Sequence, residues 1–323
     1  MKWSGEHGNG RKKLPNLNSV VYPVFNEESC LRDVIQRTIK ALDSTGQPYE
    51  IICVDDCSTD SSWKIIQELH QANNAVKGAR FLRNFGHQIG VYAGIKYTTG
   101  DYVAVLDADG QDPPELLPEM FQKCREGYEV VYAVRRKRKE GLLKRAAYAL
   151  FYRFYKMIVP FQVPLDSGDF SVFSRSVANF ISSRTEKRPF IRGLRSWHGG
   201  KQFAFEYERQ RRLAGETKYS LLKLFMLAIN ASISFSKIPL RIISILGIVT
   251  SFMALIGGIA ILVMKFISGI NLIGWTSTAV LIMFFGGLNL FVLGIIGEYI
   301  GDIFDEVKNR PAFLIDQTIG LVK

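Results

Sequence analysis

Two aspartates, Asp107 and Asp109, are separated by one alanine and follow directly after the apolar run 102–106. At the end of a buried strand, two carboxylates with this spacing can face one cleft, where a divalent cation relieves their mutual repulsion. Oxygen ligands suit Mg²⁺ or Mn²⁺, and such an ion would bridge the carboxylates to a diphosphate. Gln111 lies two positions further on and could add a neutral oxygen ligand. The motif therefore predicts a metal–diphosphate site, and the alternative is a solvated acidic loop.

A second acidic pair, Asp55 and Asp56, ends another apolar run. Carboxylates at this position can accept hydrogen bonds from a nucleobase imide or from a ribose hydroxyl. The alternative is that Asp56 or Ser58 caps the helix that follows. The residues alone leave both interpretations open.

Short apolar runs alternate with segments of helical periodicity through the region that contains both acidic pairs. Strands that alternate with helices predict an α/β fold with a parallel sheet, in which ligands bind beyond the carboxyl ends of the strands. Asp60 and Asp112 are typical start signals for the helices that follow them. The expected strands are 19–23, 50–55, 79–82, 102–106 and 129–133, and the expected helices are 29–44, 60–72, 88–98 and 114–126.

The charged residues are distributed unevenly along the chain. Its 323 residues include 41 Lys and Arg against 30 Asp and Glu, a net charge of +11, yet the mean hydropathy is +0.07. These values are compatible because residues 242–296 contain one charged side chain, Lys265. The separation excludes a simple soluble enzyme, a disordered chain and a pure multi-span transporter. It indicates a basic globular domain of about 240 residues followed by a membrane anchor.

Two charge-free stretches, 242–264 and 273–296, are each long enough to cross a bilayer, and the short turn between them predicts a two-helix transmembrane hairpin. The excess of Lys and Arg before the hairpin places both of its ends in the cytoplasm. The apolar stretch 221–235 is too short to span and predicts an interfacial helix. We therefore expect a polar tail at 1–18, a cytoplasmic domain at 19–220, an interfacial helix at 221–241, two spans within 242–296, and a cytoplasmic tail at 297–323.

The cysteines and the N-terminus agree with this location. The four cysteines form no CxxC pair and the chain has only four histidines, so we expect small buried hydrophobic side chains in a reducing compartment rather than a zinc site. Residues 1–18 lack the apolar core of a signal peptide. The chain is therefore predicted to be a multi-pass protein of the plasma (inner) membrane, with its basic domain and both termini in the cytoplasm.

A strongly basic segment lies between residues 135 and 145, where seven cations accompany one acid, Glu140. The aromatic sequence that follows it predicts a helix at the membrane surface that binds anionic lipids. A solvated charge run is the alternative, and nucleic acid is disfavoured as a partner because the chain is tethered to membrane spans. The cations are Arg135, Arg136, Lys137, Arg138, Lys139, Lys144 and Arg145.

Together these motifs resemble those of the polyprenyl-phosphate glycosyltransferases of glycosyltransferase family 2. The similarity is greatest to the bactoprenol glucosyltransferases, and dolichyl-phosphate mannose synthases are more distant. It covers about residues 19–310 and rests on motifs that occur in order: VYPVFNEE (21–28), VDDCSTD (54–60), RNFGHQIGVYAGIKYTTGD (83–101), DADGQDPPE (107–115), GDFSVFSR (168–175), FIRGLRSWHGG (190–200) and RQRRLAGETKYS (209–220).

The resemblance implies a GT-A fold and an inverting transfer of a monosaccharide from a nucleotide sugar to polyprenyl phosphate. UDP-glucose is the expected donor, and an amino-arabinose derivative, GlcNAc or mannose are alternative sugars. A non-catalytic membrane scaffold is a further alternative, although a scaffold need not keep a metal site. A homo-oligomer, such as a tetramer, is also compatible with the resemblance.

The same resemblance implies roles for individual residues. Pro23, Asn26, Glu27 and Asp56 would line the nucleotide pocket, and Asp107 would face the ribose and diphosphate. Asp109 and Gln111 would hold Mg²⁺ or Mn²⁺, together with Asp107.

The resemblance also assigns the basic residues. A loop that closes on the donor phosphates would contain Arg209, Arg211, Arg212 and Lys218, and Arg212 and Asp109 would be catalytic. Arg135, Arg145 and Arg192 would bind the acceptor phosphate. Cys57, Gly110 and Phe25 depart from the usual Gly, Leu and Tyr, which makes the sugar preference harder to predict.

Asp169 matches a family aspartate proposed as a base near the acceptor. An acceptor phosphate monoester has a second pKa near ~6, so at neutral pH it is mostly a dianion and needs no strong base. The dianion must instead approach an anionic donor, which makes cation placement more important. We therefore expect Asp169 to act either as a base or as a group that orients the substrate.

Overall fold

The computed structural model describes residues 16–135, 167–184, 186–187, 189–207, 238–268 and 274–321. The chain divides into two compact units. The sheet domain comprises residues 1–141, 161–217 and 311–323, and the helical unit comprises residues 142–160 and 218–310. The basic segment that follows residue 135 and the segment 208–237 lie outside the described residues, so the interfacial helices expected there stay predictions.

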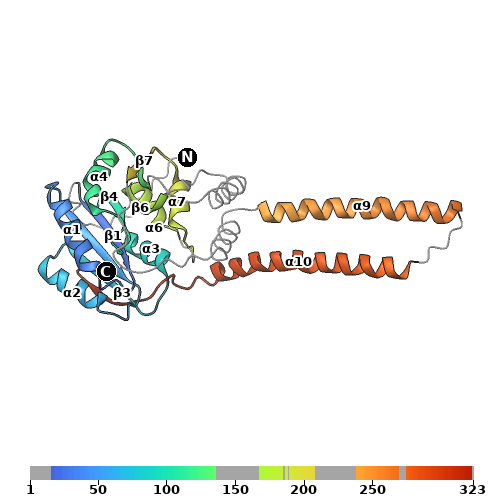
Figure 1. The fold of residues 1–323 in the computed structure, drawn as a ribbon, viewed down its shortest axis with the longest axis horizontal. Coiled ribbons are helices and arrows are strands. Elements are labelled where there is room, and N and C mark those ends of the chain that lie inside the picture. Colours follow the sequence, from blue (N-terminus) through green and yellow to red (C-terminus); the bar gives the residue numbers. More distant parts are fainter. Residues whose placement is uncertain are drawn as a thin grey trace. The chain divides into compact units, whose positions relative to one another are not determined.

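The sheet domain is built on an eight-stranded mixed sheet with the order β7-β5-β6-β4-β1-β2-β3-β8 (Figure 1). Parallel pairs join β1 to β2, β1 to β4, β2 to β3 and β5 to β7, and antiparallel pairs join β6 to β4, β6 to β5 and β8 to β3. This is the mostly parallel α/β architecture expected of a GT-A fold. The strands are Asn18–Val24 (β1), Tyr49–Asp55 (β2), Val76–Phe81 (β3), Tyr102–Val105 (β4), Val130–Arg135 (β5), Ser167–Ser174 (β6), Gln202–Tyr207 (β7) and Ile315–Ile319 (β8).

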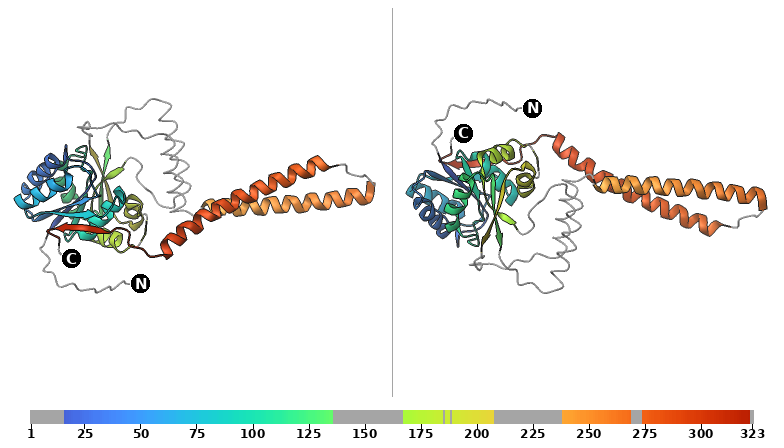
Figure 2. Two further views of the ribbon diagram at one scale, coloured as in Figure 1. Left: turned by 90° about the horizontal axis from the view of Figure 1, so that it is seen from below. Right: turned by 90° about the horizontal axis from the view of Figure 1, so that it is seen from above.

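Helices cover both faces of this sheet (Figure 2). Side chains of β1 alternate between the two faces, so that Val20 and Tyr22 pack with α1, α2 and α4, whereas Val21 packs with α3, α6 and α7. One face therefore carries α1 (Leu31–Asp43), α2 (Ser62–Ala72) and α4 (Leu117–Arg125), and the other carries α3 (His87–Tyr97), α6 (Arg175–Ser182) and α7 (Ile191–His198).

Helix α3 lies unusually close to the sheet, and this closeness fixes the position of its first residues. A Cβ at Gly94 would collide with the side chain of Val21 and lie 3.3 Å from Val54. Glycine therefore permits the contact between α3 and strands β1 and β2. The N-terminal end of α3 is consequently held at the carboxyl edge of these strands.

The C-terminal segment returns to the sheet. Strand β8 pairs with the edge strand β3, and the ring of Phe313 stacks on Phe81 with centroids 5.4 Å apart. Trp63 of α2 donates to Gln317 across 3.0 Å. Residues 297–323, expected to form only a cytoplasmic tail, therefore contain a strand that covers one edge of the sheet.

The helical unit contains two long helices, α9 (Ile238–Ser268) and α10 (Trp275–Val307). Within the described residues, one segment, Leu281–Val307, is long and apolar enough to cross a membrane, with a mean hydropathy of 1.9. The apolar run in α9, Ile243–Gly257, is shorter. The helices occur where the two spans were expected, but the described residues support a single candidate span, so the transmembrane hairpin stays a prediction.

Most of the expected strands and helices of the sheet domain are confirmed, with shifts of a few residues at their ends. The two predicted start signals make different contacts. Asp60 accepts a hydrogen bond from the Ser62 amide at 2.9 Å, close to the start of α2. Asp112 accepts a 2.7 Å bond from the Tyr207 hydroxyl, and the short 3-10 turn Pro114–Leu116, which begins two positions after Asp112, precedes α4. All four cysteines are free, and all except Cys57 are buried, as expected.

Candidate functional site

The loop after β4 holds a carboxylate in an unfavourable environment. Asp107 follows the strand by two positions, and its Oδ1 is buried without a hydrogen-bond partner among the described residues. Burial, reinforced by the charge of Asp169, raises the pKa of Asp107 to about 7. Both effects penalise the ionised carboxylate, and a bound cation would relieve them.

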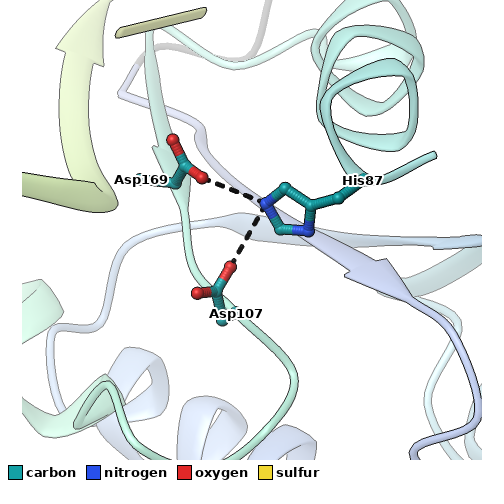
Figure 3. A group of neighbouring side chains, drawn as sticks. All are labelled: His87, Asp107 and Asp169. Atoms are coloured by element: carbon teal, nitrogen blue, oxygen red, sulfur yellow. Dashed lines mark hydrogen bonds and ion pairs between the residues drawn. The ribbon is translucent and has the colours of Figure 1, made fainter. Parts of the chain in front are cut away.

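Three side chains from three elements converge at this point (Figure 3). His87 begins α3, Asp107 follows β4 and Asp169 lies in β6. The His87 Nε2 atom lies 3.0 Å from Asp169 Oδ2 and 3.5 Å from Asp107 Oδ1. One possible ligand atom from each side chain lies within 4.8 Å of the other two. The group can therefore hold a cation, and its two carboxylates supply the oxygen ligands that Mg²⁺ and Mn²⁺ prefer.

Asp169 is buried and surrounded by hydrogen-bond donors. Arg192 Nε donates to its Oδ1 at 2.7 Å, and Arg192 Nη2 and Gln88 Nε2 both donate to its Oδ2 at 3.2 Å. Burial alone would raise the pKa of Asp169, but the hydrogen bond with His87 and the charge of Arg192 outweigh it and hold that pKa far below its usual range. For His87, burial is likewise outweighed, and the hydrogen bond to Asp169 raises its pKa. Asp169 is therefore a stable anion that organises donors and has little tendency to accept a proton.

The second acidic pair ties together the loops beside this cluster. Asp56 is buried, and its two oxygens accept the backbone amides of Phe85 at 2.6 Å and Gly86 at 2.8 Å, directly before α3. Ser58 Oγ accepts from the Asn26 amide at 3.0 Å. Neither Asp56 nor Ser58 caps α2, so that interpretation was wrong. Contact of Asp56 with a nucleotide stays a prediction, and its carboxylate also fixes the turn that presents His87.

The first loop of the predicted nucleotide pocket is equally organised. Asn26 has a positive φ of 56°, and its side-chain oxygen accepts the Thr59 amide at 2.8 Å. The thiol of Cys30 lies 3.2 Å from both Glu27 Oε2 and the backbone oxygen of Ala108. This thiol connects the loop after β1 with the acidic loop between Asp107 and Asp109. Pro23 pairs in β1 with Val54 of β2, one position before Asp55. Contact of Pro23, Asn26 and Glu27 with a nucleotide stays a prediction.

The remaining residues of the acidic loop hold its shape. Asp109 Oδ1 accepts the Gln111 amide at 3.1 Å, and Gln111 is buried. Binding of a metal by Asp109 and Gln111 stays a prediction. The structure also places His87 and Asp169 within reach of an ion bound at Asp107, which the sequence analysis did not anticipate.

The structure describes only some of the basic residues that were predicted to bind the donor and acceptor phosphates. Arg192 is described, with its side chain 38% exposed. Arg135 ends β5, but its side chain is not described. Arg145, Arg209, Arg211, Arg212 and Lys218 lie outside the described residues.

Sequence reasoning assigned no role to His87 or Gln88. Both belong to the motif 83–101, and both become site residues because the preceding turn, with Gly86 at φ 97°, brings the start of α3 to the carboxyl edge of the sheet. The available signal was a pair of polar residues directly after a glycine, at the start of a helix that begins where ligands bind in parallel sheets.

Comparison with known proteins adds independent information. A family model described as glycosyl transferase family 2 matches residues 19–181. The uncharacterized glycosyltransferase YkcC of Bacillus subtilis is 43% identical, over 94% of this chain and 94% of its own. The prophage bactoprenol glucosyl transferase homolog of Escherichia coli is 36% identical, over 92% of this chain and 97% of its own. Glucosyl-3-phosphoglycerate synthase from Mycobacterium tuberculosis, solved with Mn²⁺ and UDP-glucose, has 19% identity and a TM-score of 0.42, over 68% of this chain and 78% of its own. The two sequence relatives match nearly the whole chain, whereas the structural likeness is too distant to support a conclusion about function.

Proposed function

Because the chain belongs to glycosyltransferase family 2, we propose that it transfers one glucosyl residue from UDP-glucose to polyprenyl phosphate at the cytoplasmic face of the plasma membrane. The names of several relatives support this acceptor and sugar. Proteins called bactoprenol glucosyl transferase, from Shigella phages SfX and SfII, are 36% and 35% identical and cover 92% and 93% of this chain. The candidate span Leu281–Val307 supports a membrane-bound enzyme with a lipid acceptor.

The observation that carries the proposal is the Oδ1 atom of Asp107, which is buried and lacks a hydrogen-bond partner among the described residues, although it lies 3.5 Å from His87 Nε2. Such an oxygen fits a divalent cation, and Asp107, with Asp109 and Gln111 on the same loop, would hold Mg²⁺ or Mn²⁺. When bound, the ion would supply positive charge to the donor diphosphate and so help the nucleoside diphosphate to leave. Cys30 and Asp56 keep the neighbouring loops in register for the nucleotide.

In the proposed transfer, a phosphate oxygen of the acceptor attacks the anomeric carbon of the sugar. The new carbon–oxygen bond forms as the bond to the donor diphosphate breaks, and UDP departs with the electron pair. No proton has to be removed from a phosphate dianion, which agrees with Asp169 being held as an anion by Arg192 and His87. Asp169 then acts by fixing Arg192, whose partly exposed guanidinium would offset the charge of the incoming phosphate.

A donor panel tests the proposal. Purified protein is incubated with polyprenyl phosphate, Mg²⁺ or Mn²⁺, and radiolabelled UDP- and GDP-sugars, and label is counted in the organic phase. We expect label from UDP-glucose that depends on both acceptor and metal, and that disappears in Asp107→Asn. Label from a different sugar alone would refute the glucose assignment, and no label from any donor would refute the proposed transfer.

A further inference from the structure

Four residues at the end of α6 and the end of α7 form a surface that takes no part in the chemistry described above, although Arg192 at the start of α7 does. At its centre, the indole of Trp197 stacks on the ring of Phe180, with centroids 5.3 Å and planes 13° apart. The guanidinium of Arg184 lies 4.5 Å from the same ring centroid, and the imidazole of His198 meets the ring edge-on at 5.3 Å. We name these four residues the aromatic–basic face.

The exposure of this face is unusual for a soluble surface. Trp197 is 59% exposed, although tryptophan is a residue that folding normally buries to a large extent. Arg184 is also exposed. An exposed indole that stacks on Phe180, whose ring also meets the Arg184 guanidinium, suits the headgroup region of a bilayer, where apolar and wet surroundings meet.

The charge around the face favours an anionic partner. Residues 175–201 contain seven Lys and Arg and one acidic residue, Glu186. Two of the cations serve the interior of the domain, because Arg175 donates to the backbone oxygens of Gly100 and Thr98, and Arg195 is buried. Arg184 has its side chain at the surface, where it can attract anionic headgroups.

The chain that follows the candidate span joins the domain on the face of the sheet that α3, α6 and α7 cover. Residues 308–311 separate the end of α10 from Ala312. Ala312 and Phe313 pack against a hydrophobic cluster that includes Val177 and Ile181 of α6 and Leu194 of α7. The ring of Phe313 contacts Tyr92 of α3, so the segment that leads directly to α10 shares one hydrophobic cluster with α6 and α7.

We propose that the aromatic–basic face rests on the anionic headgroups of the membrane that α10 enters. Arg192 belongs to the same helix as Trp197, so this contact would fix the orientation of the helix that carries the cation offered to the phosphate acceptor. Only this second statement depends on the proposed function; contact of the face with lipid does not.

Fluorescence of the full chain in nanodiscs that contain anionic lipid tests the contact. One protein keeps Trp197 as its only tryptophan, through Trp3→Phe, Trp63→Phe and Trp275→Phe. The control keeps only Trp63, which is 6% exposed on the opposite face of the sheet. We expect lipids brominated near the glycerol backbone to quench Trp197 and to leave Trp63 unchanged. Equal emission of Trp197 in brominated and unbrominated nanodiscs would overturn the proposal.

A charge reversal provides the second measurement. Because one interfacial cation contributes about 5-fold to binding of an anionic surface, Arg184→Glu should reduce the quenching of Trp197 and raise the KM for bilayer-embedded acceptor at least about 5-fold. Lys64→Glu, at an exposed position of α2, makes the same change of charge and should alter neither value. Identical behaviour of the two variants would overturn the proposal. Quenching requires no turnover, so an inactive enzyme would refute the proposed function without affecting this result.

Discussion

Replacing Asp169 by asparagine separates the two roles that this carboxylate could have. Asparagine has nearly the same size but carries no charge, so it cannot hold Arg192 and His87 as ion-pair partners. In the structure Asp169 accepts two bonds from Arg192, at 2.7 and 3.2 Å, and lies 3.0 Å from His87 Nε2. The change therefore disturbs the cation proposed to face the acceptor.

The size of the effect follows from these contacts. A hydrogen bond to a charged group contributes about 1.5–3 kcal/mol, which corresponds to roughly 10- to 150-fold in kcat/KM for the acceptor. The donor KM should change little. Among the described residues, the Asp169 side chain makes no hydrogen bond to a residue that is predicted to bind the nucleotide. Loss of a true general base would instead lower kcat by about 10²–10⁴.

The pH profile decides between the two. Since the pKa of Asp169 lies far below its usual range, Asp169 stays ionised throughout the working range and contributes no titration of its own. The acid limb should come from the acceptor phosphate near pH ~6 and should persist in Asp169→Asn. Steady-state kinetics between about pH 5 and 9 measure this, with the exposed Asp33→Asn on α1 as the control. Disappearance of the acid limb, with an unchanged acceptor KM and a large loss of kcat, would refute the positioning role.

Three further predictions concern stability, each measured by thermal unfolding. Burial raises the pKa of Asp107 to about 7, so the folded protein favours the protonated carboxyl. The stability that this protonated group contributes is fully present below about pH 3.9 and is lost as the pH rises to about 7. Asp107→Asn should therefore raise the Tm of chelator-treated protein near pH 8 but not near pH 4. A lower Tm at the higher pH would contradict this. Burial raises the pKa of Glu50, but the bonds from Lys77, Thr99 and Ser19 together outweigh it and lower that pKa, so the contribution of Glu50 is present above about pH 4.3 and is lost as the pH falls further. Glu50→Gln should cost about 1.5–3 kcal/mol near neutral pH, and a difference from wild type that does not shrink in acid would count against the reasoning. Phe313→Ala removes the ring stacked on Phe81 and, because this ring is only partly buried, should lower stability by less than the ~3 kcal/mol typical of a fully buried phenylalanine; an unchanged Tm would show that the C-terminal segment is not part of the folded domain.

The alternating strands and helices, and the edge at which the acidic residues meet, could be predicted from the sequence. Local periodicity determines which face of each element is apolar, and parallel strands bring their carboxyl ends to one side. Asp107 and Asp56 were located in this way. The antiparallel pairing of β6 with β4 and β5 was harder to predict from the sequence. A long segment of the chain separates β6 from these strands, and local patterns do not indicate which strands pair over such a distance.

The partners of individual side chains were the least predictable part of the site. Asp169 and His87 are 82 positions apart in sequence, and their contact depends on α3 packing tightly against β1 through Gly94. Asp112 had the features of a helix start signal, and its hydrogen bond from Tyr207 of a distant strand could not be foreseen from them. Such choices depend on tertiary contacts, which override local preference.

The C-terminal strand illustrates the same limit. Residues 315–319 follow a long apolar helix and are short, so their pattern alone does not distinguish a strand from a tail. Their pairing with β3 arises because that strand would otherwise leave an open edge, and Phe313 adds a stacking contact that stabilises the arrangement.

Mass spectrometry of the organic phase after incubation with UDP-glucose, polyprenyl phosphate and a divalent cation tests the central claim most directly. The account predicts polyprenyl phosphate heavier by one hexose unit, formed in equal amount to the UDP released. Release of UDP with free glucose and unmodified lipid would contradict it, because the enzyme would then be transferring the sugar to water.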